Sequence, residues 1–138
     1  MANFLWFGKL HTVVYQATDG RLGHWLWHRM VLMHTIGAKS RALRSVTVQY
    51  YPVHAEGVVV IPSNNGQSRP PAWWFNLQAN PEITIQIGRD KLRVRAEVLG
   101  AKERARCWDL MRQVNPQIDR YVELSGRHIP AVLLRRLS

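Results

Sequence analysis

The chain of 138 residues has little cysteine, few acidic side chains and no long apolar run. Its single cysteine, Cys107, excludes an internal disulfide and favours a reducing compartment. No apolar run reaches the roughly 18 residues that a membrane-spanning helix needs. Lys9, His11 and Gln16 interrupt the start of the chain, so it is not a secretory signal. These absences predict a cytoplasmic protein.

Several catalytic patterns are also missing. The sequence has no HExxH, no GxSxG, no Walker loop and no GxGxxG. His24 and His28 are four residues apart, but with no second cysteine and no HExxH, structural histidines are favoured over metal ligands. Cys107 lies beside Trp108 in a helix-like stretch, which favours a buried, inert thiol over a nucleophile. No metal site is predicted.

Positive charge is plentiful. Nineteen Lys and Arg face nine Asp and Glu, which gives a formal net charge of +10. This excess predicts attraction to an anion: nucleic acid, a cofactor with phosphate or carboxylate groups, or an acidic membrane surface. Nucleic acid is the weakest of these, because Arg93 and Arg95 share a predicted strand with Glu97 and no RNP, OB or helix-turn-helix signature accompanies them. No nucleic-acid partner is therefore predicted.

The first residues carry an apolar stripe at helical spacing. Residues 1–20 are predicted to form an amphipathic helix, and residues 21–138 a single domain. The stripe consists of Trp6, Leu10, Val13, Val14 and Ala17. Trp6, Phe7, Trp25 and Trp27 lie near basic residues and suit peripheral contact with an acidic bilayer. Packing on the body of the same or a partner subunit is the favoured alternative.

The remaining pattern indicates short strands interrupted by helices. Strands are predicted at 29–36, 44–51, 58–61, 83–87, 91–99 and 129–134, and helices at 102–114 and 119–124, with a short helix after a central loop. The two strands around 88–90 form the clearest hairpin. In each strand apolar residues alternate with polar ones and are predicted to face inward: Ile83, Ile85 and Ile87 in the first, and Leu92, Val94, Ala96 and Val98 in the second. This order predicts an α+β domain built on a small, mostly antiparallel barrel with flanking helices.

Residues 63–81 (SNNGQSRPPAWWFNLQANP) join turn-forming residues to an aromatic cluster. The segment 63–66 suits tight turns and left-handed backbone, and the two prolines stiffen the chain just before the aromatic residues. One interpretation is a loop followed by a short core helix. The other is the wall of a pocket in which backbone N–H groups meet an anionic ligand.

Residues 37–44 (GAKSRALR) and 63–81 resemble the deazaflavin-dependent nitroreductase family, a branch of the split β-barrel flavin-reductase-like fold that also includes FMN-binding, pyridoxamine-oxidase-like proteins. The segment W-x-x-N-L-x-A-N-P is the most specific part of the match. The matching positions are Gly37, Lys39, Ser40, Arg44, Ser63, Gly66, Pro71, Trp73, Trp74, Asn76, Leu77, Ala79, Asn80 and Pro81.

The resemblance implies coenzyme F420 as cofactor, with FMN less favoured. Its phospholactyl and polyglutamate tail would account for the basic excess. The implied cofactor-binding residues are Lys39, Ser40, Arg41, Arg44, Val46, Ile61, Pro62, Ser63, Asn64, Asn65, Gly66, Trp73 and Asn76. Lys39 and Arg44 would hold the tail, Trp73 would cover the ring, and Asn76 would tie its helix down. The alternatives are a solvated turn for Lys39 and Arg44, and plain core aromatics for Trp73 and Trp74.

The resemblance further implies hydride transfer from the reduced deazaflavin to a quinone, nitroaromatic or enone-like acceptor, with Tyr121 on the substrate side. The chain departs from the family pattern at Ala38, Arg41, Thr47, Asn64, Asn65, Asn115 and Ile118. Because of these departures, a catalytically degenerate relative that binds a lipid or another flavin in the same cleft is the alternative. An oligomer is compatible with either hypothesis.

Overall fold

The computed structural model describes residues 30–137. The predicted helix at 1–20 and the aromatic residues Trp6, Phe7, Trp25 and Trp27 lie outside this range. Within it, no helix is long and apolar enough to cross a membrane. In chain order the elements are β1 (Met30–Ile36), β2 (Leu43–Gln49), β3 (Tyr51–His54), β4 (Gly57–Val60), the 3₁₀ helix η1 (Asn64–Gly66), α3 (Ala72–Ala79), β5 (Glu82–Ile87), β6 (Asp90–Val98), α4 (Ala101–Val114), α5 (Ile118–Ser125) and β7 (Val132–Arg136).

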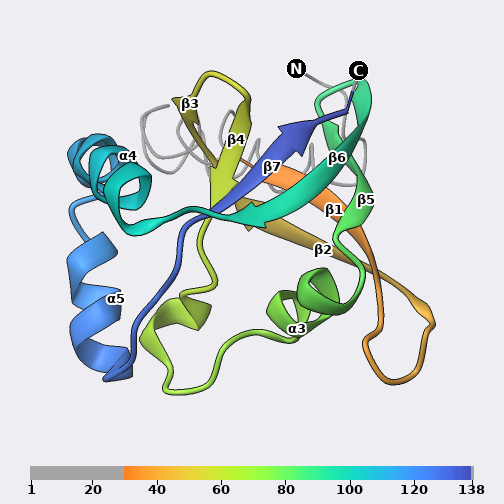
Figure 1. The fold of residues 1–138 in the computed structure, drawn as a ribbon. Coiled ribbons are helices and arrows are strands. Elements are labelled where there is room, and N and C mark those ends of the chain that lie inside the picture. Colours follow the sequence, from red (N-terminus) through yellow and green to blue (C-terminus); the bar gives the residue numbers. More distant parts are fainter. Residues whose placement is uncertain (1–29, 138) are drawn as a thin grey trace, which may run out of the picture.

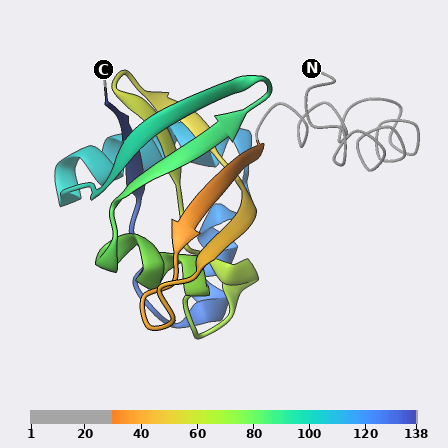
Figure 2. The ribbon, with the colours of Figure 1, turned by 90° about the vertical axis from the view of Figure 1, so that its right-hand side faces the viewer.

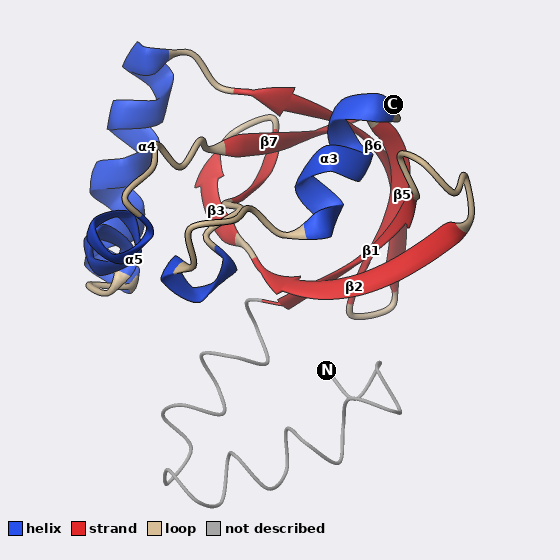
Figure 3. Cartoon of the chain, turned by 90° about the horizontal axis from the view of Figure 1, so that it is seen from below, coloured by secondary structure: helices blue, strands red, loops and turns tan. Residues whose placement is uncertain are grey.

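The strands form one curled antiparallel sheet (Figure 1). Its order is β2-β1-β5-β6-β7-β4-β3, and every neighbouring pair is antiparallel. β2 and β3 are at opposite ends of this order, yet only Tyr50 separates them in the chain. Since consecutive Cα atoms are about 3.8 Å apart, the two edges of the sheet must approach each other. Figure 3 shows the resulting ring of strands, with α3 across one opening. The α+β split-barrel prediction is confirmed.

The predicted strand 44–51 is in fact two elements. β2 ends at Gln49, and β3 begins at Tyr51 on the other edge of the sheet. Tyr50 and Tyr51 are both buried, so the in-out alternation is lost at this corner. The last strand also begins later than predicted, at Val132 instead of 129, after the segment that contains Pro130.

The predicted hairpin is confirmed as β5 and β6. Ile83, Ile85 and Val94 are at most 2% exposed. The inward placement of Val98 was wrong: its side chain is 57% exposed, because β6 ends there and the next buried residue is Leu99.

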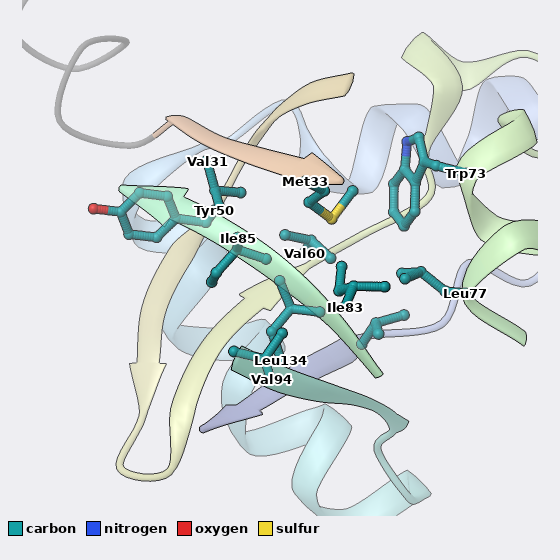
Figure 4. Close-up of a cluster of buried hydrophobic side chains, with 11 residues drawn as sticks. Val31, Met33, Tyr50, Val60, Trp73, Leu77, Ile83, Ile85, Val94 and Leu134 are labelled. Atoms are coloured by element: carbon teal, nitrogen blue, oxygen red, sulfur yellow. The ribbon is translucent and has the colours of Figure 1, made fainter. Parts of the chain in front are cut away.

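Two apolar clusters stabilise the fold. The first fills the barrel and is closed by Trp73 and Leu77 of α3 (Figure 4). The second lies between the outside of the sheet and the helices α4 and α5, and includes Cys107, Trp108 and Met111. Cys107 is buried, as predicted, and burial raises the pKa of its thiol, which disfavours the reactive thiolate.

Candidate functional site

The segments predicted to bind a cofactor meet at one end of the barrel. The turn 37–42, η1 and α3 all lie there, with α5 alongside η1 (Figures 1 and 2). We call this region, residues 37–44 and 61–79, the α3 end. Val46 lies apart from the turns, on β2, where it packs against the barrel core.

Asn76 connects α3 to the strand and turn beneath it. Its side chain is buried, and its Oδ1 accepts a hydrogen bond of 2.9 Å from the backbone N–H of Ala38. Its Nδ2 donates to Thr35 Oγ1 at 3.3 Å, and the Thr35 hydroxyl donates to the backbone carbonyl of Arg44. The predicted role of Asn76 in tying the helix down is confirmed. Asn76 therefore bonds directly to Ala38 at the start of the turn that carries Lys39, and through Thr35 to Arg44 just after the turn.

The two tryptophans of α3 belong to the packing of the barrel. Trp73 is 7% exposed within the first cluster, and Trp74 is partly buried against it. Phe75, the next residue, is 49% exposed. The core alternative therefore describes how Trp73 packs, whereas its contact with a cofactor ring stays a prediction.

The loop at 63–66 has the left-handed backbone that the sequence predicted. Asn64, Asn65 and Gly66 have φ values of 48°, 57° and 83°. The loop is closed by hydrogen bonds from Gly66 N–H to the Ser63 carbonyl and from Gln67 N–H to the Asn64 carbonyl. Asn64 Nδ2 also donates to the Arg69 carbonyl at 2.8 Å. The backbone N–H groups of Asn64 and Asn65 have no acceptor among residues 30–137. Successive free N–H groups in such turns form anion-binding sites.

The turn between β1 and β2 is held in a similar way. Gly37 N–H donates to the Ala42 carbonyl, Arg41 N–H to the Gly37 carbonyl, and Ala42 N–H to Ser40 Oγ. Arg41 has a φ of 62°, a conformation that costs little for glycine alone. Ser40 therefore shapes the turn, and Arg41 stands in left-handed backbone.

The charges of the α3 end are unbalanced. Residues 37–44 and 61–79 contain Lys39, Arg41, Arg44 and Arg69 and no Asp or Glu. Within the described part of the chain, none of these four makes an ion pair, although seven ion pairs occur elsewhere. Free cations beside free backbone donors give this end the chemistry of an anion-binding site.

Arg127 is a residue that the sequence did not identify as part of the site. Its guanidinium donates to the backbone carbonyls of Pro62 and Ser63 at 2.9 and 3.2 Å, and to those of Gln67 and Arg69 at 3.3 and 3.4 Å. No local pattern could have revealed this, because the partners are 58 to 65 residues away along the chain.

The predicted substrate-side residues lie on or near α5. Tyr121 is half-buried against the second cluster, and its backbone passes beside Gly66. Asn115 and Ile118 are buried, and Asn115 Nδ2 donates to the Tyr51 hydroxyl at 3.0 Å. Burial raises the pKa of Tyr51. At these two positions the chain uses its departures from the family pattern for packing.

Comparison with known proteins gives consistent results. The family model described as F420H(2)-dependent quinone reductase matches residues 6–136. The F420H(2)-dependent quinone reductase Rv1261c of Mycobacterium tuberculosis is 31% identical over 133 residues, which are 93% of this chain and 89% of the relative. A solved F420-H2 dependent reductase, FDR-A, is 31% identical with a TM-score of 0.67, and the match covers 78% of this chain and 94% of that one. Another solved structure, described as a domain-swapped dimer, is 31% identical with a TM-score of 0.69, over 92% and 94% of the two chains.

Proposed function

The chain belongs to the F420H(2)-dependent quinone reductase family, and from this premise we propose that its α3 end binds reduced coenzyme F420 beside a quinone acceptor. One observation carries the proposal: segments without a single acid bring together four cations and several backbone N–H groups that have no partner among residues 30–137. The protein is an oxidoreductase with coenzyme F420 as its cofactor.

The residues present fit the anionic tail of this cofactor. Lys39 and Arg44 are exposed and free of ion pairs with described residues, so their charges are available to phosphate and carboxylate groups. Charge-assisted hydrogen bonds of this type contribute about 1.5–3 kcal/mol each. The N–H groups of Asn64 and Asn65 supply further donors on the adjoining loop.

When bound, reduced coenzyme F420 supplies a hydride, so the protein's task is to bind, orient and exclude water. Trp73 and Leu77 make the floor of the site rigid because they are part of the barrel core. Asn76 holds the turn that carries Lys39 by a hydrogen bond to Ala38, and η1 packs against α5 at Gly66. We assign Tyr121 to the acceptor side on the strength of its position beside Gly66. Nitroaromatic and enone-like acceptors belong to the same proposal.

The test is a titration of the purified protein with coenzyme F420, followed by the change in deazaflavin fluorescence, and an assay of hydride transfer to menadione. We expect saturable binding with a Kd below about 100 μM and oxidation of the reduced cofactor by the quinone. Weaker binding together with a copurified lipid, detected by native mass spectrometry, would support the degenerate relative instead.

Peripheral membrane contact and oligomerisation extend this proposal to the part of the chain outside the described residues. The aromatic and basic residues of the first 29 positions support contact with an acidic bilayer. Flotation with anionic liposomes, with and without residues 1–20, tests the contact: equal flotation would mean that these residues do not bind the bilayer. Sedimentation of the same two proteins tests whether an oligomer depends on this segment.

A further inference from the structure

The guanidinium of Arg127 donates hydrogen bonds to four backbone carbonyl groups in the loop 62–69, which includes the predicted cofactor-binding residues 62–66. Nη2 donates to the carbonyl oxygens of Pro62, Ser63 and Arg69, and Nε donates to that of Gln67. Burial lowers the pKa of Arg127, and the four carbonyl oxygens replace the water that the guanidinium loses. A guanidinium carries five N–H donors in a fixed plane, a geometry that lysine cannot reproduce.

The end of α5 holds Arg127 in place. Gly126, with a φ of 65°, ends the helix, and its N–H donates to the Val122 carbonyl. Ser125 is buried; its Oγ donates to the Val122 carbonyl at 2.9 Å and accepts the N–H of Arg127 at 3.2 Å. The backbone of Arg127 is therefore fixed before its side chain reaches the loop.

The helix α5 also packs against the loop at Gly66. A Cβ atom added at Gly66 would lie 3.0 Å from Leu124 Cβ and 3.2 Å from Leu124 Cδ1. Gly66 has a φ of 83°, so both its backbone and its surroundings favour glycine. α5 thus contacts the loop through Leu124 and Tyr121 while Arg127 holds its carbonyls.

These contacts determine where the loop's N–H groups point. In a trans peptide, the carbonyl of one residue and the N–H of the next point in opposite directions. The Pro62 and Ser63 carbonyls point to Arg127, so the N–H groups of Ser63 and Asn64 point away from it. Neither N–H has an acceptor among residues 30–137.

We propose that Arg127 is a positioning residue that orients the backbone N–H groups of Ser63 and Asn64 toward the anionic part of the cofactor. The identity of the ligand rests on the proposed function, whereas the orientation of the loop does not. Arg127 acts through the loop, because its Nε and Nη2 donate to the loop carbonyls.

The test compares Arg127→Gln and Arg127→Lys with Arg120→Gln. Arg120 is an exposed arginine of α5 with no ion pair to a described residue, which makes it a matched control. Hydrogen exchange in the cofactor-free protein is measured at the Gly66 and Gln67 amides, whose hydrogen bonds close the loop. The β5–β6 amides report global stability.

In Arg127→Gln we expect loop exchange to rise about tenfold, as for the loss of roughly 1.4 kcal/mol, while β5–β6 exchange stays unchanged. The KM for reduced coenzyme F420 should rise about tenfold with kcat little altered, because ground-state binding is affected. Arg127→Lys should restore part of both, and Arg120→Gln should change neither.

Two results would overturn the positioning role and the proposed function separately. Loop exchange that is the same in both Arg127 variants and in the wild type would overturn the positioning role, whatever the cofactor. A wild-type protein with no affinity for coenzyme F420 would overturn the proposed function, and with it the cofactor as the target of the oriented donors. If Arg127→Gln fails to fold, the same comparison rests on Arg127→Lys, which keeps the charge.

Discussion

Two groups of arginines in this protein have different surroundings. Two arginines, one on β7 and one on α4, each contact two carboxylates: Arg135 contacts Glu97 and Glu56, and Arg112 contacts Asp109 and Asp119. These contacts raise the pKa of both guanidinium groups and lower the pKa of Glu97 and Asp119. At the α3 end, Arg41 and Arg44 have no acidic partner within the described chain.

The absence of any Asp or Glu from the α3 end, and not the lack of ion pairs alone, points to a ligand there, because Arg120 is also without an ion pair among the described residues. Exposed ion pairs contribute only about 0–1 kcal/mol each to folding, so pairing mainly removes repulsion between like charges. A group of cations without acidic partners repel one another, which lowers the free energy of unfolding. Such a cost persists where a bound anion offsets it, as expected at a functional site.

The largest effect is expected when the unpaired cations are removed. Lys39→Gln combined with Arg44→Gln should weaken the binding of coenzyme F420 by about 100-fold or more, since each lost charge-assisted bond is worth roughly 10-fold or more. The free energy of unfolding should change by less than about 0.5 kcal/mol, because both side chains are exposed. Fluorescence titration and urea denaturation give the two numbers.

The matched control for this pair is Arg95→Gln. Arg95 contacts Glu82 across β5 and β6, and both side chains are about half exposed. It carries the same charge on the same protein, outside the α3 end. Loss of affinity in Arg95→Gln as large as that from a single change at the α3 end would mean that net charge alone, and not the site, attracts the cofactor.

The sequence predicted the parts of the site that depend on neighbouring residues. Asn-Asn-Gly indicated the left-handed loop, because these residue types tolerate positive φ. The strict alternation of Ile83, Ile85 and Ile87 indicated β5 and its hairpin. The W-x-x-N-L motif, through its resemblance to a known family, placed Asn76 as an anchor.

What the sequence could not predict depends on contacts between distant segments. The corner at Tyr50 arises because the sheet closes on itself, which the alternation of residues 44–51 does not reveal. The contact of Arg127 with Ser63 joins residues 64 apart, and a basic residue after a helix-ending glycine has no local signature of that role. The buried Asn115 likewise has its hydrogen-bond partner, Tyr51, 64 residues away along the chain.

A smaller effect, on the free energy of unfolding, is expected when Asp119, the ion-pair partner of Arg112, is replaced. Asp119 accepts hydrogen bonds from Arg112 and, at 3.0 Å, from the buried indole N–H of Trp108. Asp119→Ala leaves that N–H without an acceptor and should lower the free energy of unfolding by about 1–2 kcal/mol. Asp119→Asn keeps an oxygen for Trp108 and should cost less than about 1 kcal/mol, since the half-exposed ion pair is screened by solvent. Neither change should alter cofactor affinity.

The pH dependence of stability tests whether the charge of Asp119 stabilises the folded state. Hydrogen bonds from Arg112 and Trp108 hold the pKa of Asp119 below its ordinary value. The contribution of its charge is therefore present above the unfolded pKa and is lost as the pH falls through the folded pKa. The free energies of unfolding of the wild type and Asp119→Asn should differ at about pH 7, and the difference should begin to shrink as the pH falls below about 4. If the difference in the free energy of unfolding stays constant down to about pH 2, it does not come from the charge of Asp119.

The smallest effect concerns Arg41, which belongs to the unpaired group and also occupies left-handed backbone. Arg41→Gly relieves about 1–2 kcal/mol of backbone strain but makes the unfolded chain more flexible, so the net gain in stability is about 0.5 kcal/mol. Ala42→Gly, at the neighbouring position without a positive φ, should destabilise by a similar amount. If backbone strain at Arg41 determines the result, urea denaturation should show a higher free energy of unfolding for Arg41→Gly and a lower one for Ala42→Gly. Cofactor affinity should fall only slightly in Arg41→Gly if Lys39 and Arg44 hold the tail, so this position separates the strain of the turn from its charge.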